Sequence, residues 1–117
     1  MIETLEIANP DKTFIKVIGV GGGGGNAVSY MYKAGVEGVD FILMNTDKAA
    51  LKRSSVPKRI LLGKKGLGAG SDPRIGKAAM LSVEENVRQL LSEDTEMVFV
   101  TATLGGGTGT GGAPVVA

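Results

Sequence analysis

The sequence FIKVIGVGGGGGNAV, residues 14–28, carries the strongest indication of how this chain folds. Its first part, Phe14 to Val20, is β-branched and nearly all apolar, which is typical of a strand buried on both faces of a parallel sheet. Gly21 to Gly25 and Asn26 follow directly, and apolar residues then recur at helical spacing from Ala27 to Ala34. This order predicts a phosphate-binding loop, because glycine lets backbone N–H groups face an anion at a helix N-terminus.

A second glycine run, GGGTGTGG, occupies residues 105–112 and contains Thr108 and Thr110. It follows another strand-like segment, Glu96 to Ala102, which we expect to be buried, and it precedes a helix-like segment. The carboxyl ends of parallel strands meet at one edge of a sheet, where open α/β folds bind ligands. The two runs therefore predict a site that holds phosphate groups from two sides.

The remaining pattern predicts an alternation of strands and helices. Further strands are expected at residues 41–44 and 59–62, and further helices at 48–53 and from Pro73, capped by Asp72 or Ser71, to about Leu91. With connections of crossover length, this order predicts an α/β fold with a Rossmann-like, mostly parallel sheet and helices on both faces. We expect residues 1–12 to be a polar lead and residues 13–117 to be the folded part, cut within its last helix.

Composition and charge exclude several classes of function. The 117 residues carry 13 basic and 12 acidic side chains, so no broad positive field favours nucleic acid or an anionic membrane. The chain has no cysteine and no histidine, which excludes thiolate chemistry, an imidazole base and the usual zinc sites. With no signal peptide and no apolar stretch of about 18 residues, the chain is expected to be cytoplasmic.

Two common nucleotide-binding motifs partly match glycine-rich segments of the chain. Gly19, Gly21 and Gly24 satisfy G-x-G-x-x-G after a strand, with Asp47 as a candidate ribose partner, so a dinucleotide-dependent oxidoreductase remains an alternative. That alternative gives no reason for the second glycine run. A P-loop is excluded, because five residues separate Gly70 from Gly76 where four are required, and Ala78 replaces the magnesium-binding hydroxyl.

Four segments closely resemble the tubulin/FtsZ superfamily and, within it, the FtsZ family of bacterial cell division: Ile15 to Val28, Asn45 to Asp47, Gly66 to Gly70, and Gly105 to Gly111. The resemblance covers about residues 13 to 117. It implies an N-terminal part of a GTP-binding domain from a GTP-hydrolysing protein that forms filaments and scaffolds the division ring. GTP or GDP is the implied cofactor, with Mg²⁺ whose protein ligands are not assigned.

The resemblance also implies which residues contact the nucleotide. On one side, the residues implied to contact the phosphates are Gly22, Gly23, Gly24, Gly25 and Asn26. On the other side they are Gly105, Gly106, Gly107, Thr108 and Gly109. Accessory loops near the phosphate and ribose supply Asn45, Asp47, Ala69, Gly70 and Ser71. The sequence departs from the family pattern at Thr103 and Leu104, where glycine and methionine are usual. A β-branched Thr103 is expected to affect the geometry of the loop.

No catalytic residue is implied within these 117 residues. In the superfamily, acidic residues on a later loop complete hydrolysis in the nucleotide site of the next subunit, so we expect this chain alone to be inactive. The implied partners are further copies of the protein in head-to-tail filaments, together with membrane-tethering and other division proteins. Neither nucleic-acid binding nor direct membrane insertion is expected, and the implied location is the mid-cell division site.

Overall fold

A computed structural model describes residues 15–63, 72–92, 95–103 and 107–117. Its centre is one sheet of four parallel strands in the order β3-β2-β1-β4. The strands are β1 (Ile15–Val20), β2 (Val39–Asn45), β3 (Lys58–Leu61) and β4 (Met97–Ala102). All four lie within one or two residues of the predicted segments, and their parallel pairing confirms the predicted α/β fold.

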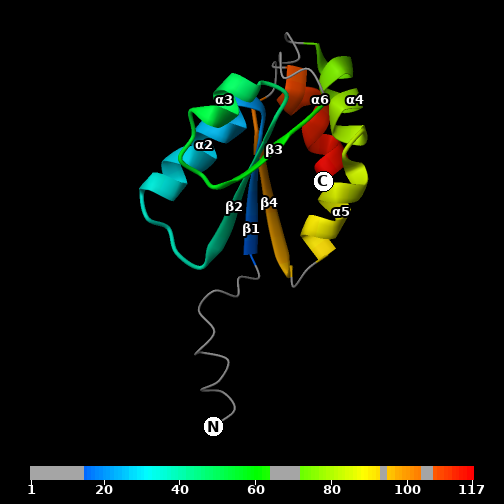
Figure 1. Ribbon diagram of the computed structural model, residues 1–117. Helices are drawn as coiled ribbons and strands as arrows, with labels where there is room; N and C mark the ends of the chain where they lie inside the picture. The colour runs from blue at the N-terminus through cyan, green and yellow to red at the C-terminus, as the bar shows by residue number, and fades with distance from the viewer. Residues whose placement is uncertain (1–14, 64–71, 93–94, 104–106) are drawn as a thin grey trace.

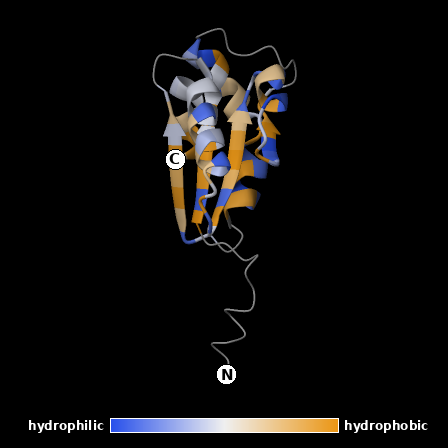
Figure 2. Ribbon diagram, turned by 90° about the vertical axis from the view of Figure 1, so that its left-hand side faces the viewer, coloured by the Kyte–Doolittle hydropathy of each residue, from blue (hydrophilic) through white to orange (hydrophobic). Residues whose placement is uncertain are grey.

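Helices cover both faces of the sheet (Figure 1). One face carries α2 (Gly21–Lys33) and α3 (Lys48–Lys52), and the other carries α4 (Pro73–Leu81), α5 (Glu84–Ser92) and α6 (Gly107–Val116). This two-sided cover follows from central strands that are apolar at successive positions, and Figure 2 shows much of the sheet in orange. No helix among the described residues is long and apolar enough to cross a membrane.

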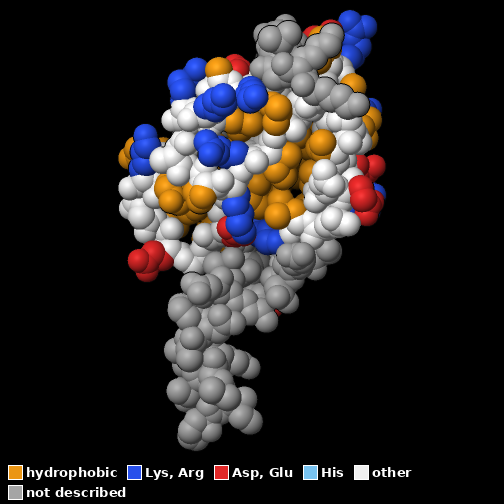
Figure 3. All heavy atoms as spheres, viewed as in Figure 1, with side chains coloured by type: hydrophobic (Ala, Val, Ile, Leu, Met, Phe, Trp, Pro, Cys, Tyr) orange, Lys and Arg blue, Asp and Glu red, His pale blue; other side chains and the backbone are white. Residues whose placement is uncertain are grey.

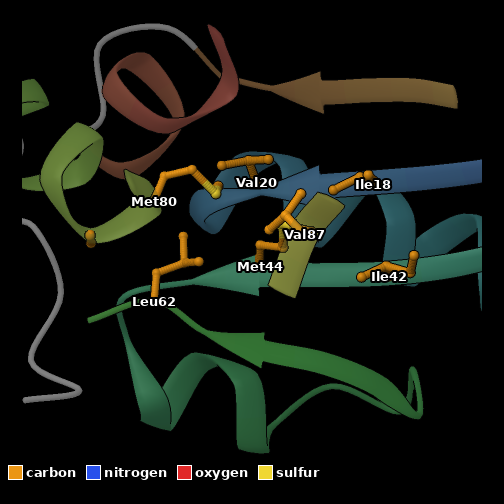
Figure 4. Packing of buried hydrophobic residues seen from close by; sticks show 8 residues of the cluster. Ile18, Val20, Ile42, Met44, Leu62, Met80 and Val87 are labelled. Carbon is orange, nitrogen blue, oxygen red and sulfur yellow. The ribbon is translucent and has the colours of Figure 1, made fainter. Parts of the chain in front are cut away.

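Two apolar clusters form the core, one on each face of the sheet. The cluster beneath α4 and α5 contains Ile18, Val20, Ile42, Met44, Leu62, Ala79, Met80 and Val87, most of which Figure 4 shows packed together. The cluster beneath α2 and α3 contains Val17, Val28, Phe41, Leu43, Leu51 and Val56. Full burial of a large apolar side chain contributes roughly 1.5–3 kcal/mol to folding, so both layers of helices are held by the sheet they cover.

The prediction that β4 is a buried strand is wrong for one of its faces. Met97 is 51% exposed and Phe99 is 53% exposed. Register places Phe99 beside Val17, on the face of the sheet that α2 and α3 cover. Since β4 lies at the edge of the sheet, the described helices do not extend over these two side chains.

The helix predicted from Pro73 to Leu91 is interrupted at Ser82 and Val83. Its predicted start is confirmed, because Pro73 is the first residue of α4 and the Asp72 side chain accepts a hydrogen bond from the Arg74 backbone nitrogen at 3.0 Å. At the other end the Ser82 hydroxyl donates to the Ala79 carbonyl at 2.6 Å. A serine hydroxyl that bonds to the preceding turn competes with the helical backbone, which explains the separate helix α5.

Candidate functional site

The first glycine run forms the start of helix α2, not a loop that precedes the helix as the sequence predicted. Gly21 has a φ of +79°, a left-handed conformation that turns the chain directly from β1 into the helix. Val20 occupies the N-cap position and provides no side-chain cap. The N–H groups in the first turn of α2 therefore have no partner within the helix, and they face outward from its N-terminus.

Close contact with the sheet explains why this helix begins with glycine. A methyl group placed on Gly24 would overlap the Thr101 carbonyl oxygen and lie 3.3 Å from Cα of Ala102. On the other side, a methyl group on Gly19 would overlap the Gly24 carbonyl oxygen and lie 2.8 Å from Val28 Cγ2. Glycine at these two positions lets α2 lie directly against the ends of β1 and β4.

The part of the second glycine run that the structure describes, from Gly107 onward, likewise begins a helix, α6. Gly107, Thr108 and Gly109 are buried at its N-terminus. A methyl group on Gly21 would lie only 3.0 Å from the Gly109 nitrogen, so the first turns of α2 and α6 are in contact. Gly76 of α4 packs on the opposite side, since a methyl group there would lie 2.7 Å from Cα of Thr108.

A cavity of about 550 Å³ lies at the carboxyl ends of the strands, between these helix N-termini and α3. Nine of the residues predicted to bind nucleotide line it: Gly22, Gly23, Gly25, Asn26, Asn45, Asp47, Gly107, Thr108 and Gly109. Gly24 is not part of the lining, because it is buried against β4. Ala69, Gly70, Ser71, Gly105 and Gly106 lie outside the described residues.

The turn after β2 forms one wall of the cavity. Asn45 Oδ1 accepts hydrogen bonds from the backbone nitrogens of Thr46 at 2.8 Å and Asp47 at 3.3 Å. Asp47 caps α3, since its Oδ1 accepts from the nitrogens of Ala49 at 3.0 Å and Ala50 at 3.2 Å. These bonds fix the turn, so both predicted side chains have a structural role beside their place in the cavity wall.

A buried pair of hydroxyls joins this turn to α6. Thr46 Oγ1 and Thr108 Oγ1 lie 2.6 Å apart and share a hydrogen bond in which either can be the donor. Thr46 was not among the predicted site residues, although it lies within the Asn45 to Asp47 segment that the sequence singled out. Its position between two predicted site residues, Asn45 and Asp47, could have indicated that Thr46 also belongs to the site.

Two basic side chains and two serines complete the far end of the cavity, and the sequence did not predict them. Lys33 and Arg53 belong to the lining, as do Ser29 and Ser54, whose hydroxyls lie 2.8 Å apart. Helical spacing could have placed Ser29 and Lys33 on one face with Asn26, three and seven residues away. Nothing in the sequence brought Arg53 to the same place. Figure 3 shows Lys and Arg side chains gathered over α3.

The electrostatics of the cavity favour an anion. Two helix N-termini present partial positive charge to it, and Lys33 and Arg53 add two full positive charges. Asp47 is the single carboxylate in the lining that the described residues provide. No cluster of three or more His, Cys, Asp or Glu side chains suited to a metal exists in the described ranges.

Together the fold and cavity define a class of protein: an α/β domain in which two glycine-bearing helix N-termini converge on one cavity at the carboxyl ends of parallel strands, an arrangement suited to phosphate groups. Comparison with known families agrees. Residues 14–117 match the tubulin/FtsZ family, GTPase domain, and the chain belongs to this family.

Similar proteins carry cell-division names. The chain is 51% identical to cell division protein FtsZ 1 of Archaeoglobus fulgidus, over 98% of this chain and 32% of that protein. It is 52% identical to cell division protein FtsZ of Aquifex aeolicus, over 96% of this chain and 30% of that one. It thus spans about a third of the length of these curated relatives.

Solved structures show the same fold. An empty FtsZ dimer from M. jannaschii matches with a TM-score of 0.85 and 44% identity, over 98% of this chain and 34% of that one. A GTPγS-bound protofilament of CetZ2 from Haloferax volcanii matches with a TM-score of 0.75 and 37% identity, over 87% of this chain and 34% of that one. These matches do not favour the dinucleotide-dependent oxidoreductase that the sequence left open.

Proposed function

We propose that this chain forms the phosphate-binding part of a GTPase that assembles into filaments during cell division. The observation that carries the proposal is the convergence of the first turns of α2 and α6 on one cavity of about 550 Å³. That volume lies within the range of about 300–1,000 Å³ typical of ligand pockets. The family match, and the nucleotide-bound protofilament among similar structures, support guanine nucleotide as the ligand.

In this proposal the first turns of α2 and α6 both bind phosphate groups of the nucleotide. Backbone N–H groups at Gly22 and Gly23 would bind phosphate oxygens from one side, and those at Thr108 and Gly109 from the other. A hydrogen bond to a charged group contributes roughly 1.5–3 kcal/mol, so several together support tight binding. Predicted contacts from Gly25, Asn26 and Asn45 are retained in the proposal, since all three residues line the cavity.

Asp47 is the residue with which this chain would bind a magnesium ion. Mg²⁺ in nucleotide sites is held by one or two carboxylates together with substrate phosphates, and Asp47 is a carboxylate in the cavity wall. When bound, the ion would neutralise phosphate charge. One Asp47 oxygen already accepts two backbone hydrogen bonds, so the side chain is held in a fixed position.

Hydrolysis also needs a group that positions water, and Asp47, the single carboxylate that the described residues bring to the cavity, is already assigned to the magnesium ion. We therefore propose that an acidic loop of the adjacent subunit supplies this group when copies assemble head to tail. Similar proteins solved as a dimer and as a protofilament support self-association. We further propose that the protein acts in the cytoplasm at the mid-cell division site, where membrane-tethering and other division proteins would bind it.

A dilution series tests the shared site. Phosphate release from GTP by the full-length protein should rise more steeply than in proportion to protein concentration, because each site requires a neighbour. The isolated chain of 117 residues, assayed alongside, should release no phosphate. Constant specific activity down to concentrations without filaments would exclude a site shared between subunits.

A further inference from the structure

Thr103 lies between the two glycine-bearing helix starts. It follows the last residue of β4, its side chain is exposed, and it belongs to the cavity lining. A methyl group built on Gly23 would overlap Thr103 Oγ1 and lie 2.7 Å from its Cβ. The Thr103 side chain therefore lies directly against the backbone of Gly23, in the first turn of α2.

The backbone of Thr103 makes the matching contact with α6. A methyl group on Gly109 would lie 2.8 Å from the Thr103 carbonyl oxygen. One residue thus has its side chain against one phosphate-binding turn and its carbonyl against the other. Any group held between Gly23 and Gly109 has Thr103 as its neighbour.

Among the described residues, nothing occupies the Thr103 hydroxyl, and the residue is exposed in the cavity lining. No group in the part of the chain that the structure describes forms a hydrogen bond with it. A threonine side chain is stiff at χ1, and contact with Gly23 restricts it further, so little entropy is lost when its hydroxyl donates to a ligand. The Thr103 side chain lies against the first turn of α2, whose backbone N–H groups have no partner within the helix and favour an oxyanion.

We infer that Thr103 is a phosphate-binding residue of this site, whose hydroxyl donates a hydrogen bond to an oxygen of the bound nucleotide beside Gly23. The inference rests on the proposed function, and it adds a side-chain donor to the backbone donors already described. It also explains why a side chain larger than glycine is accommodated at this position without closing the cavity: Gly23 provides the space.

Thr103→Val and Thr103→Ser in the full-length protein separate the hydroxyl from the shape of the side chain. Valine keeps the volume and loses the donor, whereas serine keeps the donor and loses the methyl group. Calorimetric titration with GDP should show about tenfold weaker binding for Thr103→Val and near-parental binding for Thr103→Ser. Thermal unfolding without nucleotide provides the control that both variants are folded.

The comparison between the two variants decides the outcome. If Thr103→Ser does not bind GDP at least about fivefold more tightly than Thr103→Val, the hydroxyl is not a ligand and the inference is overturned. Should the valine variant fail to fold, Thr103→Ala takes its place, since alanine and serine differ only in the hydroxyl. Failure of the parent protein to bind GDP would instead contradict the proposed function.

Discussion

Thr46 and Thr108, which are 62 residues apart in the sequence, share a hydrogen bond of 2.6 Å between their side-chain oxygens. Both residues are buried, with 5% and 7% of their surface exposed. The bond ties the end of β2 to the first turn of α6, at the wall of the cavity. Because one proton suffices for the bond, the other hydroxyl keeps its proton for a ligand.

Thr108→Ala should weaken GDP binding by about tenfold or more, because it removes one member of this pair while the glycine backbone is kept. Thr108→Ser retains the hydroxyl and is the matched control, expected to bind nearly as the parent does. The measurement is calorimetric titration of the full-length protein. Affinity and turnover equal to the parent in Thr108→Ala would show that Thr108 acts only as a spacer.

The loss in a Thr46→Ala/Thr108→Ala double variant should be smaller than the sum of the two single losses. Residues that share a hydrogen bond typically show coupling of about 0.5–3 kcal/mol. The same titrations complete this double-mutant cycle. Strict additivity would mean that the two hydroxyls act independently on the nucleotide.

Asp47→Asn should raise the magnesium concentration needed for half-maximal GTP turnover by several-fold, with little change in stability. Asparagine caps a helix about as well as aspartate, so α3 should remain capped while the carboxylate charge is lost. Turnover measured against magnesium concentration, together with thermal unfolding of both proteins, tests this expectation. An unchanged magnesium dependence would assign Asp47 to helix capping alone.

Gly24→Ala should destabilise the protein by about 1–3 kcal/mol, because the added methyl group overlaps the Thr101 carbonyl oxygen. Gly22→Ala is the control within the same helix, since a methyl group there meets nothing within 4 Å. Chemical unfolding without nucleotide gives both values. Equal stabilities of the two variants would contradict the close packing of α2 against β4.

Asp72 should make the stability of the protein dependent on acid pH. The side-chain hydrogen bond from Arg74 lowers the pKa of Asp72 below its ordinary value of 3.8. A lowered pKa means that the ionised carboxylate stabilises the folded state above pH 3.8, and this contribution is lost as the pH falls through the folded-state pKa. The thermal midpoint of the parent should therefore fall more on acidification than that of Asp72→Asn, and parallel curves would contradict this.

The sequence predicts the centre of the sheet well because its two central strands contain long apolar runs. The run from Phe14 to Val20 and the segment Phe41 to Met44 read as buried parallel strands, and both lie in the centre of the sheet. The exposure of Phe99 was not predictable in this way. It depends on which strand lies at the edge of the sheet, a property of the whole topology that no local pattern contains.

The sequence predicts which residues line the cavity better than it predicts their conformation and arrangement. Glycine is about 1 kcal/mol less favourable than alanine in a helix, so residues 21–25 read as a loop. They begin α2, and the close packing of Gly24 against Thr101 and of Gly21 against Gly109 is possible only for glycine. Lys33 and Arg53 reach the cavity from the ends of two helices, which requires the tertiary arrangement of α2 and α3.

Calorimetric titration of the full-length protein with GDP, GTP and NAD tests most directly whether the glycine starts of α2 and α6 hold guanine nucleotide. We expect submillimolar dissociation constants for GDP and GTP and little binding of NAD, since two converging helix N-termini suit a nucleotide phosphate chain. Tight binding of NAD with none of GDP or GTP would contradict the account.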